Sequence, residues 1–123
     1  MIETIKFMNS ELEKIGLNYQ FDEWKSSPIP NTYWVGEYNE AGEADDGSDE
    51  TTFILTGTTT QSRLILEVQK DMIKKHFDKL TAILDSGSGV AVDYSNAFPV
   101  PTGTEDIRRV QINMTIKEWT VTE

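Results

Sequence analysis

The sequence has no cysteine and a single histidine among its 123 residues. The missing thiols exclude disulfide bonds and thiolate metal ligands, and they are typical of proteins kept in a reducing cytoplasm. The first residues carry acidic side chains where a signal peptide needs basic ones, and no apolar run approaches the roughly 20 residues of a membrane span. We therefore expect a soluble, unexported protein with no membrane partner.

Basic side chains are also scarce. Eleven lysines and arginines stand against 21 aspartates and glutamates, which gives a formal net charge of -10. A surface of that sign makes nucleic acids and anionic membranes unfavourable partners, and we expect no sequence-specific nucleic-acid binding. Much of the excess falls in residues 39–50, where acids and glycines occur without lysine or arginine. This stretch predicts a mobile acidic loop.

The sequence also lacks the residue patterns that are typical of catalytic and ligand-binding sites. His76 lies beside lysines, and the sequence nominates no orienting acid or nucleophile for it. The acids between Gly42 and Glu50 miss the ligand spacing of a calcium loop, which leaves a solvated loop, or loose cation binding as the alternative. Glycines 87 and 89 follow a predicted helix, whereas a phosphate-binding loop precedes one. We expect no catalytic, cofactor or metal site.

The clearest structural pattern is a period-two alternation between Arg108 and Val121. It predicts a long strand with one buried face, formed by Val110, Ile112, Met114 and Ile116. Helical spacing predicts one helix over residues 2–15, which Gly16 ends, and a second over residues 63–84. The apolar residues on or near one face of the second helix are Ile65, Val68, Met72, Ile73, Phe77, Leu80 and Leu84.

The remaining strands are expected at 17–25, 32–38, 51–58 and 90–94, with a stiff loop over 96–103. The order α-β-β-β-α-β-β predicts an α+β two-layer sandwich, with two helices on one face of a mostly antiparallel sheet of about five strands. The length suits a single α+β domain over residues 1–123.

Residues 32–38 are apolar on both faces of their strand, so they are covered twice within the domain or exposed where a neighbouring subunit packs. Arg108 and Arg109 point to opposite faces, so one of them can anchor an acid of this chain or of a neighbour. The candidate interaction residues are Trp34, Tyr38, Glu43, Asp45, Asp46, Asp49, Pro99, Pro101, Arg108 and Arg109.

Three segments resemble small prophage proteins of Gram-positive bacteria that are encoded among head–tail joining and tail genes. They are 32–38 (TYWVGEY), 50–57 (ETTFILTG) and 87–119, which includes GSGVAVDY, PVPTG and RVQINMTIKEW. The predicted element order is also similar to that of tail terminator proteins, which are α+β subunits that assemble as a ring, commonly a hexamer, and cap the tail tube.

The resemblance implies a structural protein that is not an enzyme. Its partners would be further copies of itself, the tail tube and neck proteins, and it would assemble in the host cytoplasm and enter the tail or neck of the virion. A negative ring lumen would let DNA pass by repelling it. Three alternatives remain: a small acidic inhibitor that mimics DNA, another non-enzymatic binding module, and a small-molecule enzyme with a pocket between helix and sheet.

Overall fold

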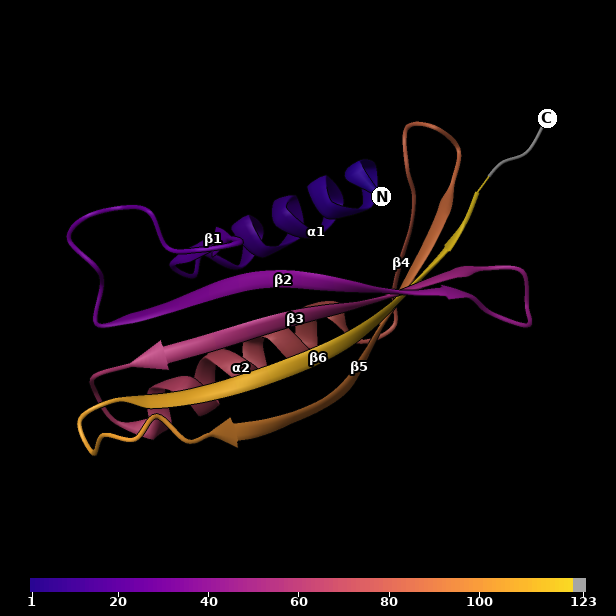
Figure 1. Cartoon of the computed structure of the whole chain (residues 1–123). Coiled ribbons are helices and arrows are strands. Elements are labelled where there is room, and N and C mark those ends of the chain that lie inside the picture. Colours follow the sequence, from indigo (N-terminus) through magenta and orange to yellow (C-terminus); the bar gives the residue numbers. More distant parts are fainter. Residues whose placement is uncertain (121–123) are drawn as a thin grey trace.

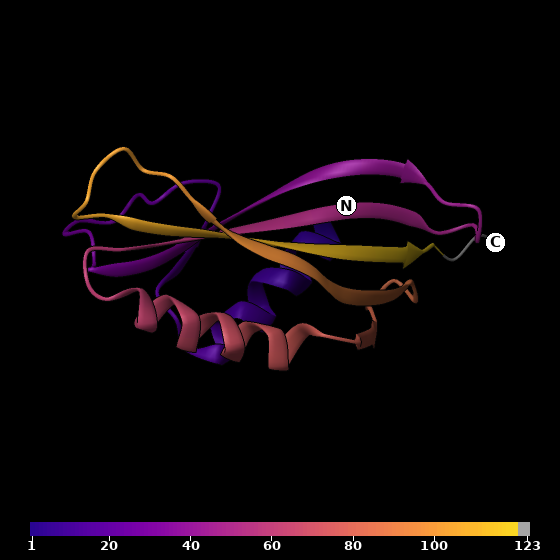
Figure 2. The same cartoon turned by 90° about the horizontal axis from the view of Figure 1, so that it is seen from below.

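One twisted sheet of six strands carries both helices on the same face (Figures 1 and 2). The computed structural model describes residues 1–120. In chain order its elements are α1 (Ile2–Ile15), β1 (Tyr19–Phe21), β2 (Thr32–Glu43), β3 (Asp49–Thr59), α2 (Arg63–Phe77), β4 (Leu80–Ile83), β5 (Gly89–Val100) and β6 (Arg108–Trp119). The strand order across the sheet is β1-β2-β3-β6-β5-β4. The predicted α+β class is confirmed.

Strand β6 lies inside the sheet, between β3 and β5, and pairs antiparallel with both. Its alternate side chains Val110, Ile112, Met114 and Ile116 are buried against the helices, as the alternation predicts. The expected strand extends to Val121, which lies outside the described residues.

Both helices form where the sequence predicts their starts. Helix α1 buries Met8 and Leu12 and ends at Gly16, whose φ of 85° suits a residue without a side chain. Helix α2 begins after Ser62, whose Oγ accepts a hydrogen bond from the Leu64 N–H at 3.2 Å. Neither helix is long and apolar enough to span a membrane, within the described part of the chain.

The second helix is shorter than predicted, because it ends at Phe77 instead of Leu84. Asp78 has an extended backbone with ψ of 123°, Lys79 adopts a positive φ of 62°, and the next four residues form β4 against β5. The apolar pattern at Leu80 and Leu84 is compatible with either element, and pairing with β5 decides it. The sheet therefore has six strands instead of about five.

The expected acidic loop over 39–50 is mostly strand. Residues 39–43 of β2 pair with 49–52 of β3, and only Ala44–Ser48 form the turn of this hairpin. Two backbone hydrogen bonds close the turn, from Ala44 N–H to the Ser48 carbonyl and from Gly47 N–H to the Ala44 carbonyl. A strand is predicted from alternating apolar and polar residues. These strand residues are acidic and exposed and do not alternate with apolar ones, so the sequence pattern does not reveal the strand.

The expected loop over 96–103 is also partly strand. Strand β5 continues to Val100 after an irregularity between Tyr94 and Asn96, and it therefore includes Pro99. Proline is tolerated there because β4 pairs only with residues 89–92, so the rest of β5 is a sheet edge.

Most strand pairs are antiparallel, but β1 pairs parallel with β2. Residues 22–31 return the chain to the other end of the sheet, so β2 runs in the same direction as β1. The first two strands therefore do not form the antiparallel pair that their proximity in sequence favours.

The core centres on Trp34, which is fully buried between the sheet and α2. Its Nε1–H donates a hydrogen bond of 2.6 Å to Oε1 of Gln69 on α2. The indole ring lies over Gly57 on the neighbouring strand, where a Cβ would stand 2.6 Å from two ring carbons. The ring therefore needs a glycine at that position.

Replacing Gly57 by alanine should destabilise the protein by about 1–3 kcal/mol, because a rigid buried ring has to move. Gly89→Ala is the matched control, since that strand glycine meets only an Ile83 methyl carbon at 3.8 Å. Urea unfolding of both variants measures the difference. Equal unfolding midpoints for the two variants would contradict this account of the core.

Candidate interaction surfaces

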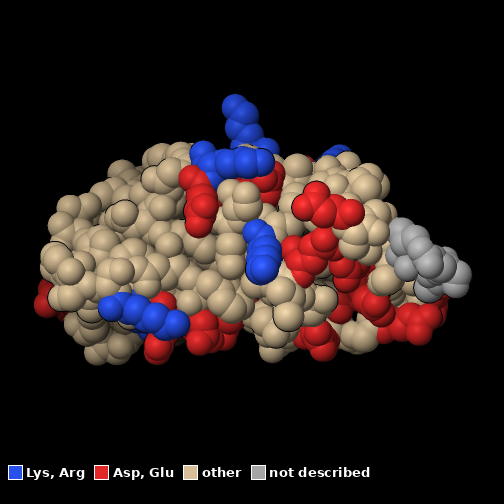
Figure 3. Space-filling view, turned by 90° about the horizontal axis from the view of Figure 1, so that it is seen from above, with Lys and Arg blue, Asp and Glu red and all other residues tan. Residues whose placement is uncertain are grey.

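The β2–β3 hairpin carries the largest concentration of acidic side chains. We call residues 37–50 the acidic arm; its acids are Glu37, Glu40, Glu43, Asp45, Asp46, Asp49 and Glu50. Figure 3 shows acidic side chains gathered at one end of the molecule, the end toward which the hairpin projects in Figure 1. The charge of the chain is therefore unevenly distributed in space.

Asp46 has a structural role in the turn of the arm. Its Oδ1 accepts hydrogen bonds from the N–H and the Oγ of Ser48, at 3.0 and 2.6 Å. Its Oδ2 lies 3.0 Å from Nζ of Lys117, which is also 3.7 Å from Glu50. The hydrogen bonds from Ser48, with a smaller effect from Lys117, lower the pKa of Asp46 to about 2, and Asp46 raises the pKa of Lys117.

The other acids of the arm have no basic partner within 4.0 Å among residues 1–120; these are Glu37, Glu40, Glu43, Asp45 and Asp49. Lys117 thus neutralises only part of the arm, and the rest of its charge faces solvent.

An apolar recess lies beside the arm on the helix side of the sheet. Met1, Ile2, Ile5, Phe21 and Tyr38 line it, with Lys6 at the rim, and its volume is about 330 Å³. Tyr38 is 39% exposed and stacks on Phe21 with ring centroids 6.2 Å apart, while Ile2 is 75% exposed. Two apolar side chains therefore remain accessible at the base of the arm.

A second, acidic recess continues from the first through Met1, which lines both. It measures about 260 Å³, and its lining residues are Met1, Glu40, Gly42, Asp49, Glu50, Thr51 and Glu118. Glu118 accepts a hydrogen bond of 2.7 Å from Oγ1 of Thr4, while Glu40 and Asp49 are exposed. The underside of the arm thus changes from apolar to acidic along its length.

Helix α2 exposes an apolar stripe that the sequence pattern misassigns. Val68 and Met72 are expected near the buried face, but they are 61% and 41% exposed, and Leu64 is 72% exposed. The buried side chains are Leu66, Ile73 and Phe77. Spacing of four residues places Leu64, Val68 and Met72 in one row on the opposite face of the helix.

Of the candidate residues named from the sequence, Trp34 offers no surface to a partner because it lies in the core. Pro99 and Pro101 are exposed, as are Glu43, Asp45, Asp46 and Asp49.

The two arginines make contacts within the chain. Arg109 Nε donates to Thr58 Oγ1 at 3.1 Å, and Arg108 Nη1 donates to the Glu105 carbonyl at 3.3 Å. Neither has an acidic partner within 4.0 Å in the described residues. Because Arg108 pairs with Thr59 whereas Glu118 pairs with Asp49, the arginines lie at the end of the sheet away from the acidic arm. The candidate residues therefore form two separate groups.

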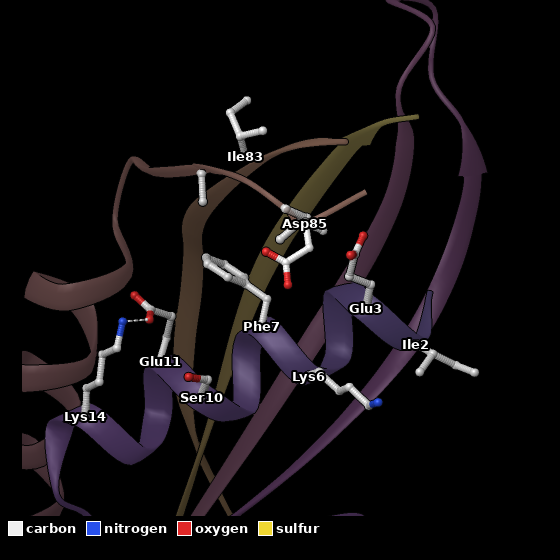
Figure 4. Close-up of a pocket in the computed structure, with 11 residues that line it drawn as sticks. Ile2, Glu3, Lys6, Phe7, Ser10, Glu11, Lys14, Ile83 and Asp85 are labelled. Atoms are coloured by element: carbon white, nitrogen blue, oxygen red, sulfur yellow. Dashed lines mark ion pairs between the residues drawn. The ribbon is translucent and has the colours of Figure 1, made fainter. Parts of the chain in front are cut away.

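An open groove of about 680 Å³ separates α1 from the segment around β4 (Figure 4). Glu11 lines it and pairs with Lys14, and it lies 3.3 Å from Nε2 of His76. Burial raises the pKa of Glu11, but the hydrogen bonds from Lys14 and His76 outweigh burial, so its pKa lies below the ordinary value. Glu11 and Lys14 of the groove are thus already engaged with each other, and within residues 1–120 no acid or histidine cluster has metal-binding geometry.

No protein-family model matches the chain, and no curated protein matches it. Several solved structures are similar in fold, and they include the following two. A chain from the virion of a native gene transfer agent particle has a TM-score of 0.66 at 12% identity, over 88% of this chain and 83% of that one. A second protein, whose name states no function, has a TM-score of 0.67 at 16% identity, over 96% of this chain and 97% of that one. At these identities the likeness shows the fold alone.

The Asp46 contacts predict a titration that NMR can follow. The carboxyl of Asp46 should titrate with a pKa of about 2, below its ordinary value of 3.8. Its contribution to stability should be fully present above pH 4 and disappear as the pH falls toward 2. Ser48→Ala should raise the pKa more than Lys117→Met does, because it removes the hydrogen bond from Ser48 Oγ, the largest single cause, while the backbone N–H bond remains. A larger shift in Lys117→Met would contradict this order of causes.

Proposed function

We propose that this chain is a structural protein of a phage-like particle, and that it acts as a ring-forming tail terminator or head–tail joining subunit. The observation that carries the proposal is the fold, shared over 88% of the chain with a chain of a gene transfer agent virion. Fold likeness is an analogy for function. The resemblance of residues 32–38, 50–57 and 87–119 to prophage tail and head–tail joining proteins supports the same role.

Open strand edges support a role in assembly. Strand β1 pairs with only three residues of β2, and β4 pairs with only four residues of β5. Residues 37–43 of β2 and 93–100 of β5 therefore pair with a neighbouring strand on one side only. The backbone groups on their other side have no neighbouring strand in the described chain. Such edges, together with the segment from Pro99 to Pro101, offer contacts to further copies, to the tail tube and to neck proteins.

The acids at the tip of the arm suit the lumen of a ring. Glu43, Asp45 and Asp49 are exposed and unpaired in the described residues, so they would present negative charge to DNA passing through. Repulsion between these carboxylates and the DNA phosphates prevents the ring from binding the DNA. In this role the chain is made in the host cytoplasm and ends in the tail or neck of the particle.

Deleting the gene from the bacterium that carries it tests the role directly. Electron microscopy of the particles released should show tails of irregular length or heads that are not joined to tails, because the tube end is left uncapped. Supplying the wild-type chain from a plasmid should restore normal particles. Normal joined tails in the deletion strain would contradict the proposal.

Neutralising the tip of the arm tests the part assigned to its charge. Glu43→Gln, Asp45→Asn and Asp49→Asn together should lower the yield of infectious or transducing particles by about tenfold or more. The reason is that the lumen no longer repels the DNA that passes through it. Asp46 stays unchanged because it holds the turn.

Three exposed acids outside the arm, Glu23, Glu105 and Asp106, provide a matched control when replaced by their amides. The control changes the net charge equally and should leave the yield unchanged. Equal particle yields from both triple variants would contradict a role for the charge of the arm in DNA passage.

A further inference from the structure

The exposed stripe on α2 and the two recesses under the acidic arm are chemically complementary. Each surface changes from apolar to charged along its length, and the two charges have opposite signs. The recesses change from apolar, around Ile2 and Tyr38, to acidic, around Glu40. The stripe changes from apolar, at Leu64, Val68 and Met72, to basic at Lys75 one turn further on. An exposed apolar row beside a charge is typical of an interaction surface.

The charges on both surfaces are available to a partner. Lys75 and Lys79 have no acidic side chain within 4.0 Å among residues 1–120, and Glu40 has no basic one. Lys75 and Lys79 are exposed. By contrast, Lys70 on another side of α2 pairs with Glu67.

We propose that α2 of a second copy of this chain docks into the recesses under the acidic arm. Leu64, Val68 and Met72 of one copy pack against Ile2, Phe21 and Tyr38 of the next, and Lys75 lies against Glu40. Opposite charges on two patches of the same chain favour pairing between copies and fix its register. This contact deepens the proposed ring function and rests on it, because a contact between different patches, repeated from copy to copy, can close a ring.

Cysteine pairs test the contact, because the natural chain has no thiol to interfere. Glu40→Cys protein labelled with heavy nitrogen is mixed with unlabelled Lys75→Cys protein under mild oxidation, and mass spectrometry counts the mixed disulfides. A contact raises the local thiol concentration, so the mixed dimer should exceed that of a Glu105→Cys and Lys75→Cys mixture by about tenfold or more. Equal amounts of mixed dimer in the two mixtures would overturn the proposal.

The apolar part of the contact has its own test. Adding Val68→Asp to the Lys75→Cys protein should reduce the mixed disulfide to the level of the Glu105→Cys mixture, because it places a charge in the apolar recess. Ile29→Asp is the matched control, since Ile29 is also an exposed apolar residue but lies between β1 and β2. A disulfide yield that survives Val68→Asp would overturn the packing of the stripe.

The double variant Glu40→Cys with Lys75→Cys separates this contact from the ring function. A ladder of cross-linked species that ends at a closed ring supports both. Cross-linked dimers that never extend support the docking contact and contradict the ring. Rings seen by electron microscopy without cross-links above the control contradict the contact and leave the ring function in place.

Discussion

The difference in length between strands and helices determines which surfaces this protein exposes. A strand rises about 3.3 Å per residue and a helix 1.5 Å, so the long strands extend over roughly 40 Å whereas each helix extends over only about 22 Å. Strands β2, β5 and β6 have 12 residues each, and the two helices have 14 and 15. The helices therefore cover only part of one face of the sheet. Where they end, the strands continue as the acidic arm and leave the recesses beneath it.

This arrangement separates a packed half from an exposed half. Between the helices and the sheet lies a continuous apolar core that includes Trp34 and Phe53 of the sheet and Phe77 of α2. At the N-terminal end of α1 and beyond it, the recess on the same face of the sheet is lined by Glu118, Glu40 and Asp49. Carboxylates at these positions keep the uncovered end soluble in a monomer, and they leave a charged surface that a basic partner can neutralise. The proposed contact between copies uses this surface.

The parts that the sequence predicts well are those whose pattern admits one interpretation. Strand β6 alternates without a break, and α1 combines helical spacing with a glycine stop, so both follow from the residues. The end of α2 does not, because Leu80 suits a helix or a strand until its pairing with Val92 is known. The strand residues 39–43 and 49–50 of the acidic arm are missed because they bury little, and pairing across the hairpin cannot be read from composition.

Burial of single residues was harder to predict than the elements that carry them. Val68 and Met72 have the spacing of a core stripe, but the orientation of α2 is set by Leu66, Ile73 and Phe77. Trp34 is apolar on a strand with two apolar faces, and only the fold shows that α2 covers it. The acidic residues of the candidate surface could be named in advance, because charge stays at the surface whatever the fold.

Counting the copies that bind to a tail tube tests the central claim most directly. The wild-type chain, carrying one fluorophore per copy, is added to tubes from the deletion strain, and bleaching steps are counted at each tube end. A ring-forming terminator predicts a fixed number of copies, about six, at one end of each tube. Copies scattered along the tubes, or no copies bound at all, would contradict the account.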